Sequence, residues 1–464
     1  SHVQVSRRYL TLTEPSEGCD LMTSRRQELK NAALSAIDER KGHFVAIGEQ
    51  ISAYPELGYK ERRTGRLVAD ELEEMGLPVE RGLALTGCKA TAEGHETGPT
   101  IGVIGELDAV VCWDHPQADA ETGAAHACGH NIQLGVMLGV AAGLLGSGVM
   151  QELAGSVSFL AMPAEEYVEL AFRDQLRAKG EISFFGGKQE FLRRGHLDSI
   201  DIAMAVHSVD MDSHGKKAMV GAISTGFVGK RVQYRGRACH AGSAPDEGIN
   251  ALNAAVLGLS GIHVQRETFP DREKIRVHPI ITRGGDLVNI VPDDVQLETY
   301  VRGLTIEGIR DANMKVNRAL QAGAMAVGAK VKITEIPGYM PLVNAPILDG
   351  ALKANLLQFL TPNEVVEGGE FGGSTDFGDL SQIMPSLFAL FGGISGALHT
   401  KDFRMKDPEI AYVLPAKAIA ATIIDLLTDG ASMARRVVEG FRPRMSREEY
   451  FRFQSEMSRV VEWP

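Results

Sequence analysis

Apolar residues follow two alternating patterns along the first half of this chain. Continuous apolar runs over residues 100–104, 156–162 and 202–206 predict buried strands. Between them, apolar residues return at helical spacing, as in the small-residue run 132–145. Buried strands that alternate with covering helices are typical of an α/β protein with a doubly wound, mostly parallel sheet.

The pattern changes after about residue 215. Strand-like alternation and helix-like spacing now follow one another in the order strand-helix-strand-strand-helix-strand, over residues 228–234, 250–262, 274–282, 294–302, 309–327 and 330–336. This order is the split βαβ pattern of a ferredoxin-like α+β module. An α/β pattern resumes after it. We therefore expect one catalytic domain, built from residues 1–218 and 337–464, that is interrupted by an inserted domain at 219–336.

Length, charge and cysteine content narrow the class of protein. A chain of 464 residues is too long for one ordinary core. Its net charge of -12 and the absence of a long basic run make nucleic acid and anionic membranes poor partners. No apolar run approaches the ~20 residues of a membrane span. The 5 scattered cysteines do not suggest a disulfide framework, so we expect a cytoplasmic enzyme.

Side chains that bind metals follow the predicted strands at the points where those strands end. Ligands of open α/β sheets gather at the carboxyl ends of the strands. A hydrolase that uses metal-activated water needs thiolate, imidazole or carboxylate ligands and one further carboxylate that does not bind the metal. The candidate donors are Cys128, His130, Glu165, Glu166, His207 and His399.

The adjacent residues Glu165 and Glu166, the acidic pair, are expected to have two different roles. Adjacent residues leave an extended chain on opposite sides, so one carboxylate can bind metal while its neighbour Glu165 faces the attacking water. Each donor also has an ordinary alternative when it is taken alone: a buried structural cysteine, a capping histidine or a surface acidic pair. Their joint occurrence at loop junctions favours the metal site.

Five further residues have open roles. Asp108 follows a buried strand and either orients a ligand histidine or stabilises its turn. Asp376 either orients a metal ligand by a hydrogen bond or caps a helix. His240, in the inserted domain, is either a surface residue or a lid residue that stabilises an oxyanion. Asn289 and Arg302 could hold a substrate carboxylate, Arg302 by its bidentate fork.

Two motifs carry a resemblance to a known family. They are His126-Ala127-Cys128-Gly129-His130-Asn131 and, upstream, Gly105-Glu106-Leu107-Asp108-Ala109. With them, the chain resembles the aminoacylase and glutamate carboxypeptidase superfamily of di-metal hydrolases over residues 55–427. Within it, the chain looks most like the N-acyl-amino-acid amidohydrolase branch, in the subgroup of p-aminobenzoyl-glutamate hydrolase and β-alanyl-lysine dipeptidase.

The resemblance implies a complete catalytic apparatus. Two Zn or Mn ions would be bound by Cys128, His130, Glu166, His207 and His399, with Cys128 as the bridge. Glu165 aligns with the general base, and His240 aligns with a lid histidine that crosses a homodimer interface formed by residues 219–336. Asn289 and Arg302 align with positions that bind a small N-acyl-amino acid or dipeptide. Other branches have a histidine in place of Glu106, so the resemblance gives Glu106 no ligand role.

Two other functions stay open at this point. Cys128 could be the nucleophile of a thiol hydrolase, with His130 or His126 as its base. Alternatively, the chain could be a non-catalytic binding protein on the same scaffold. The charged segment 167–194 is a long insertion near the acidic pair, and we expect it to form part of the pocket wall.

Overall fold

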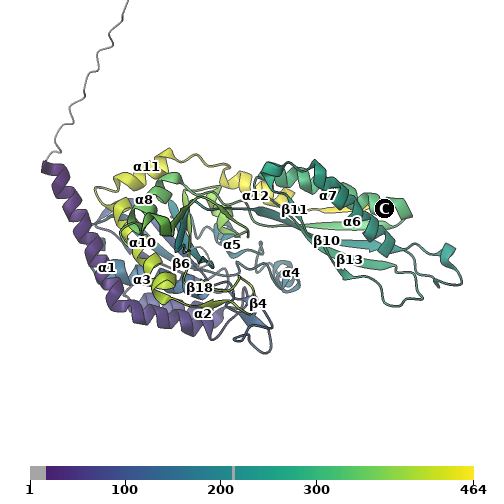
Figure 1. Cartoon of the computed structure of the whole chain (residues 1–464), viewed down its shortest axis with the longest axis horizontal. Helices are drawn as coiled ribbons and strands as arrows, with labels where there is room; N and C mark the ends of the chain where they lie inside the picture. The colour runs from purple at the N-terminus through teal and green to yellow at the C-terminus, as the bar shows by residue number, and fades with distance from the viewer. Residues whose placement is uncertain (1–16, 212–214) are drawn as a thin grey trace, which may run out of the picture.

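The computed structural model describes residues 17–211 and 215–464, and it has two parts (Figure 1). A large α/β part contains an 8-stranded sheet, and a smaller part at the other end of the molecule contains a 6-stranded sheet. This arrangement confirms the predicted fold class.

The large sheet has a parallel centre and a mixed edge. Its strand order is β1 (Val79–Leu83), β2 (Gly87–Glu93), β6 (Ala154–Met162), β3 (Glu96–Glu106), β7 (Ile202–Ser208), β17 (Ser386–Phe391), β8 (Ala218–Val220) and β15 (Val365–Glu367). Strands β6, β3, β7 and β17 run parallel to one another, whereas β1 and β2 are antiparallel. The three runs predicted as buried strands are β3, β6 and β7. Their side chains are buried on both faces of the sheet, which explains their continuous apolar sequences.

Helices cover both faces of the large sheet. One face is covered by a core to which α1 (Glu17–Ser52), α2 (Arg62–Glu74), α3 (His130–Gly146), α8 (Pro346–Leu356), α10 (Leu414–Leu427) and α11 (Ser432–Gly440) contribute. The opposite core contains side chains from α5 (Gly187–Arg194), α9 (Phe377–Ser381) and α12 (Arg447–Glu456). Helix α4 (Leu170–Ala178) lies between the two parts of the molecule (Figure 1).

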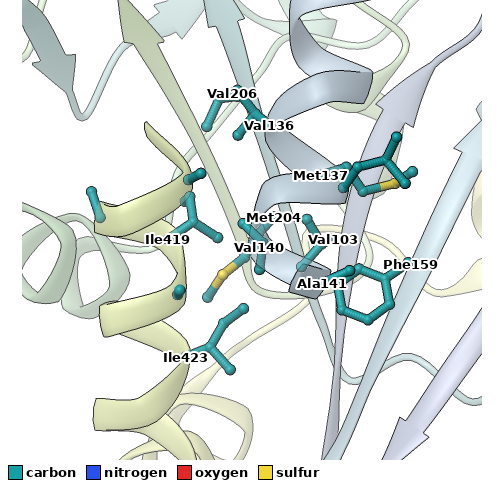
Figure 2. Close-up of a cluster of buried hydrophobic side chains, with 14 of the residues drawn as sticks. Val103, Val136, Met137, Val140, Ala141, Phe159, Met204, Val206, Ile419 and Ile423 are labelled. Atoms are coloured by element: carbon teal, nitrogen blue, oxygen red, sulfur yellow. The ribbon is translucent and has the colours of Figure 1, made fainter. Parts of the chain in front are cut away.

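Helix α3 is the centre of the first core, and its apolar side chains are buried all round. Val140 lies on the side of α3 that faces Ile419 and Ile423 of α10, and Met137 lies on the side toward Phe159 (Figure 2). Glycines allow the neighbouring helix α1 to approach closely, because a Cβ on Gly143 would lie 2.6 Å from Ile37. This packing fixes the amino end of α3, where the motif His126–Asn131 lies. The helical stretch Glu409–Leu427 is long and apolar enough to cross a membrane, but 83% of its apolar 18-residue window is buried inside the protein.

The smaller sheet contains the inserted domain. Its strands are β11 (Arg276–Val277), β13 (Asp294–Gly303), β10 (Gly226–Arg235), β14 (Lys330–Pro337) and β20 (Val460–Trp463), with β12 (Ile280–Arg283) paired to β13. Helices α6 (Ala251–Gln265) and α7 (Ile306–Val327) pack on it through a separate core. Short two-stranded ladders elsewhere are β4 (Val110–Val111) with β5 (Ala124–Ala125), β9 (Ile223–Ser224) with β16 (Glu370–Phe371), and β18 (Ile394–Ser395) with β19 (Arg404–Met405).

Two details of this domain differ from the sequence expectation. The expected strand 274–282 is divided into β11 and β12 around Pro279, which cannot donate a hydrogen bond to a ladder. The last strand, β20, pairs antiparallel with β14, although residues 337–464 were expected in the catalytic domain. The C-terminus therefore returns to the smaller sheet (Figure 1).

Candidate metal centre

The candidate donors meet at the carboxyl edge of the large sheet. Strand β6 leads into Glu165 and Glu166, β7 contains His207, and the loop after β17 contains His399. His130 is the first residue of α3, and Cys128 precedes it. The five candidate ligands, distant in sequence, are thus brought to one place by parallel strands and one helix start.

Cys128 belongs to two groups of donor atoms. Cys128, His130 and His207 offer atoms that all lie within 4.8 Å of one another, and so do Cys128, Glu166 and His399. The Sγ atom of Cys128 is 3.3 Å from Nε2 of His207. In the second group, Nε2 of His399 is 2.9 Å from Oε1 of Glu166. The thiol is therefore common to both groups of donor atoms.

The backbone around the centre adopts conformations that side chains rarely take. Ala164 and His399 have φ values of 56° and 61°, and Gly129 has a φ of 90°. A positive φ is strained for residues other than glycine and persists where the surroundings enforce it. The amide of His399 donates a hydrogen bond of 2.8 Å to the carbonyl of Ala127, which ties this loop to the cysteine loop.

The charges of the centre favour a thiolate at Cys128 and a protonated imidazole at His399 in the absence of bound ions. Burial alone would raise the pKa of Cys128, but the imidazoles of His130 and His207 lower it well below its ordinary value. Burial would lower the pKa of His399, whereas Cys128 and Glu166 raise it to about 11. The thiolate is the form of cysteine that binds metals. Bound cations would compensate the negative charges of Cys128 and Glu166.

Several polar atoms of the centre are buried without a hydrogen-bonding partner among the described residues. They are Oε1 of Glu166, Nε2 of His130 and Oε2 of Glu106. Buried polar atoms in proteins are nearly always paired. Unpartnered atoms of imidazoles and carboxylates beside a thiolate, in groups within 4.8 Å, are a donor set that fits the two divalent ions that the resemblance implies.

Asp108 supports the centre from behind. Its carboxylate accepts hydrogen bonds from the amides of Glu165 and Glu166, at 3.0 and 2.8 Å. Its carbonyl lies 2.8 Å from Nδ1 of His130. A proton on Nδ1 leaves Nε2 free to face the centre. Of the two roles considered for Asp108, the geometry favours the one that orients a histidine, and it adds the positioning of the acidic pair.

Glu165 lies beside the donors with its carboxylate buried. Burial raises the pKa of Glu165 well above its usual range, and the neighbouring charges of Glu106 and Glu166 raise it further. Tyr339 donates a hydrogen bond to its carbonyl. A carboxyl group with a raised pKa is suited to take part in proton transfer.

A cavity of about 580 Å³ opens onto the centre. Cys128, Glu165, Glu166, His207 and His399 all line it, and so do Arg302 and four aromatic side chains, Tyr167, Phe227, Tyr300 and Tyr339. Arg302 comes from strand β13 of the inserted domain, and its guanidinium lies 5.2 Å from the ring of Phe227. The structure thus places Arg302 in the cavity, as expected for a residue that binds substrate.

Other predicted residues lie elsewhere. His240 and Asn289 are exposed on the inserted domain, where the amide of Ala241 bonds to the carbonyl of Asn289, and neither lines this cavity. Asp376 contacts Lys188 rather than a candidate ligand histidine. Within segment 167–194, only Tyr167 and Val168 line the cavity, so most of the expected pocket wall lies outside it.

Lys188 is a charged residue near the centre that sequence reasoning did not identify. Lys188 is fully buried and forms ion pairs with Glu106 and Asp376. A Cβ on the preceding Gly187 would lie 1.6 Å from the carbonyl oxygen of Pro163, so only glycine allows α5 to start against the acidic-pair turn. The pair Gly186-Gly187 was the sequence feature that could have indicated this close approach. A lysine in a charged segment, however, is ordinarily exposed.

Comparisons with known proteins agree with this geometry. The sequence profile of peptidase family M20/M25/M40 matches residues 102–424. Xaa-Arg dipeptidase of Mus musculus is 28% identical over 434 residues, which cover 89% of this chain and 92% of the relative. N-acetyl-L-cysteine deacetylase of Bacillus subtilis is 25% identical, over 81% of this chain and 85% of the relative.

The fold is also similar to solved structures. A crystal structure of a dinuclear metal-binding M20 peptidase from Bacillus subtilis matches with a TM-score of 0.64 at 21% identity, over 84% of this chain and 99% of the other. The resemblance seen in the two motifs is confirmed by the family match. The chain therefore belongs to peptidase family M20/M25/M40 and is a metal-dependent hydrolase of amide bonds.

Proposed function

We propose that this protein is a di-metal hydrolase that cleaves the amide bond of an N-acyl-amino acid or a dipeptide. The observation that carries the proposal is the position of Cys128, which is shared by two groups of donor atoms with Glu165 beside them. Cys128, His130, Glu166, His207 and His399 would hold the ions. Relatives named for dipeptide and N-acetyl-amino-acid hydrolysis support the substrate class.

The chain's own residues then have defined tasks. Two bound Zn or Mn ions would lower the pKa of a water molecule and polarise the scissile carbonyl. Glu165 would accept the proton of that water and pass it to the leaving amine. Arg302, the cation of the inserted domain that lines the cavity, would bind the substrate carboxylate, and the aromatic walls would exclude water.

His240 and Asn289 would act from the partner subunit of a homodimer. The Nδ1 atom of His240 accepts hydrogen bonds from the amides of Gly242 and Ser243, at 3.2 and 3.1 Å, so its proton belongs on Nε2. An outward N–H is the donor that an oxyanion needs. Exposed apolar side chains beside it, Leu287 and Val288, favour a contact with a second copy through residues 219–336.

The thiol-hydrolase alternative uses the same lowered pKa of Cys128. Its sulfur is buried, with an imidazole on one side and the Glu166 and His399 pair on the other, which supports a ligand more than a nucleophile. A binding protein on this scaffold would not need a buried carboxylate of raised pKa beside the donors. We also propose a reducing, cytoplasmic location, which the free thiols of Cys88, Cys112, Cys128 and Cys239 support.

A substrate panel on defined metal forms tests the proposal. Chelator-stripped protein would be reloaded with Zn or Mn and given N-acetyl- and N-benzoyl-amino acids and dipeptides, with release of the free amine as the measurement. We expect hydrolysis only in the reloaded forms. Hydrolysis that survives chelation would support the thiol enzyme, and absence of both turnover and bound metal would support the binding protein.

A further inference from the structure

A second cavity, of about 320 Å³, lies beside the loop that precedes α3. Its walls come from the carboxyl end of α1, the start of α3, the loop after β4 and the segment that runs from the loop of His399 into β19. Among the described residues, none lines both this cavity and the cavity of the metal centre. The second cavity is therefore separate from the proposed active site.

Two buried side chains that line this cavity have unpaired polar atoms. His126 and Asn131 are each 3% exposed. Both ring nitrogens of His126 and Oδ1 of Asn131 lack a hydrogen-bonding partner within residues 17–211 and 215–464. The amide nitrogen of Asn131 is already used, because it donates to the carbonyl of Gly48 at 3.2 Å and to Oη of Tyr412 at 3.3 Å. Buried polar atoms are nearly always paired, so these unpaired atoms indicate an occupant of the cavity.

His115 lines the same cavity, and its ring is fully paired by the protein. Its Nδ1 atom accepts a hydrogen bond from the amide of Gln117 at 3.2 Å, and its Nε2 atom lies 3.0 Å from the carbonyl of Phe403. An unpaired ring is thus peculiar to His126 of these two histidines. Burial lowers the pKa of His126 to about 3, so its ring is neutral and offers one N–H donor and one acceptor nitrogen. The occupant must therefore supply both an acceptor and a donor.

Acceptors and cations come from different walls of the cavity. On the helical wall, Oη of Tyr412 donates a hydrogen bond to Glu49 at 2.9 Å and accepts one from Asn131, so a carboxylate and an amide are held around one hydroxyl. On the wall that leads from His399 into β19, Lys401 and Arg404 line the cavity with exposed side chains. A carboxylate and an amide oxygen only accept hydrogen bonds, whereas an ammonium and a guanidinium only donate them. The lining thus suits an occupant with charges of both signs.

We propose that this cavity binds an aliphatic α-amino acid in its zwitterionic form. The ammonium of the ligand would donate to Glu49 and to Oδ1 of Asn131, and its carboxylate would accept from Lys401 and Arg404. The ring of His126 would bond to the same two groups through its acceptor nitrogen and its N–H. The aliphatic side chain would contact the apolar residues of the lining, which are Pro116, Ile132, Phe403 and Met405.

The loops that line this cavity also contain proposed metal ligands. His126 precedes Cys128 by two residues, and the amide of His399 donates a hydrogen bond of 2.8 Å to the carbonyl of Ala127. Lys401 follows His399 by two residues. An amino acid held by His126 and Lys401 would therefore restrain both loops without occupying the cavity of the metal centre. An α-amino acid is also the class of product that the proposed function releases, and this link alone rests on that function.

Calorimetric titration of the Zn-loaded protein with L-leucine tests the proposal. Lys401→Glu reverses a charge of this cavity, and Lys179→Glu makes the same change at an exposed position outside it. We expect Lys401→Glu to raise the Kd of L-leucine by about 10–100-fold, whereas Lys179→Glu should leave it unchanged. Leucinol, which lacks the carboxylate, and 4-methylpentanoate, which lacks the ammonium, should each bind more weakly than L-leucine by a similar factor. Crystals soaked with L-selenomethionine should show an anomalous selenium peak in the cavity of His126.

The possible outcomes are distinct. No binding of L-leucine, an equal Kd in the parent and in Lys401→Glu, or selenium only at the metal centre would each overturn the inference. Leucinol or 4-methylpentanoate that binds as tightly as L-leucine would overturn the zwitterionic ligand. Both changed lysines are exposed, so the comparison does not depend on a buried variant that fails to fold. None of these measurements uses turnover, so a failed substrate panel would refute the proposed function and leave this test unchanged.

Discussion

The guanidinium of Arg302 donates a hydrogen bond from Nη1 to Oγ of Ser374 over 2.7 Å. Arg302 belongs to strand β13 of the inserted domain, and Ser374 belongs to the loop before α9 in the large domain. Both residues line the cavity that also contains Cys128 and Glu165. The inserted domain therefore supplies a cation to the cavity at the candidate metal centre of its own chain.

Replacing this cation should weaken substrate binding. Arg302→Lys keeps the charge but loses the planar fork, so we expect KM to rise roughly tenfold to a hundredfold with a smaller change in kcat. Steady-state kinetics with an N-acyl-amino acid measures it. A matched control is Arg235→Lys, on the exposed end of β10. A substrate whose carboxylate is amidated should not distinguish Arg302→Lys from the parent, and if it does, Arg302 does not bind the carboxylate.

The role of Glu165 predicts a variant that binds metal but turns over slowly. Glu165→Gln should retain fold and both ions and lose about 10²–10⁴-fold in kcat, because only the proton acceptor is removed. Metal analysis and kcat would be measured on the same preparation. Glu169→Gln, which removes a carboxylate outside the cavity, serves as the control. Full turnover in Glu165→Gln with unchanged metal content would refute the assignment.

Delivery of His240 from a partner subunit can be tested by complementation. Glu165→Gln and His240→Ala should each be inactive alone. When the two are mixed and allowed to exchange subunits, one site of each mixed dimer has an intact Glu165 and an intact partner His240. We therefore expect recovery of about a quarter of the normal activity. Absence of recovery, with mixed dimers demonstrated by mass spectrometry, would place His240 outside the partner's site.

The inserted domain should lose stability in acid. Burial alone would raise the pKa of Glu335, but the ammonium of Lys230 and hydrogen bonds from Asn317 and Arg459 lower it to about 2. A lowered carboxyl pKa stabilises the fold above the unfolded pKa near 4.5, and that stability is lost as the pH falls toward 2. Burial lowers the pKa of Lys230 to about 8, so the lysine is protonated throughout this window.

Urea unfolding between pH 5 and pH 2, followed through Trp463 in a Trp113→Phe background, measures this loss. Allowing for solvent screening near Arg459, we expect it to be about 2 kcal/mol. Glu335→Gln should be less stable at pH 5 and show a flatter pH dependence. An equally steep dependence in that variant would contradict the explanation.

Strands and candidate donors could be predicted from the sequence where a local pattern of residues indicates them. Buried parallel strands have continuous apolar runs, so β3, β6 and β7 and the donors at their ends could be identified. Glu106 and Lys188 could not, because their relationship depends on the contact of α5 with the turn at Pro163. The pairing of β20 with β14 joins distant segments, and no local pattern indicates it.

An anomalous difference map from crystals of the Zn-loaded protein tests the di-metal centre most directly. We expect two peaks about 3.5–4 Å apart, with Sγ of Cys128 between them. A single peak, or two peaks that are not both next to Cys128, would contradict this centre.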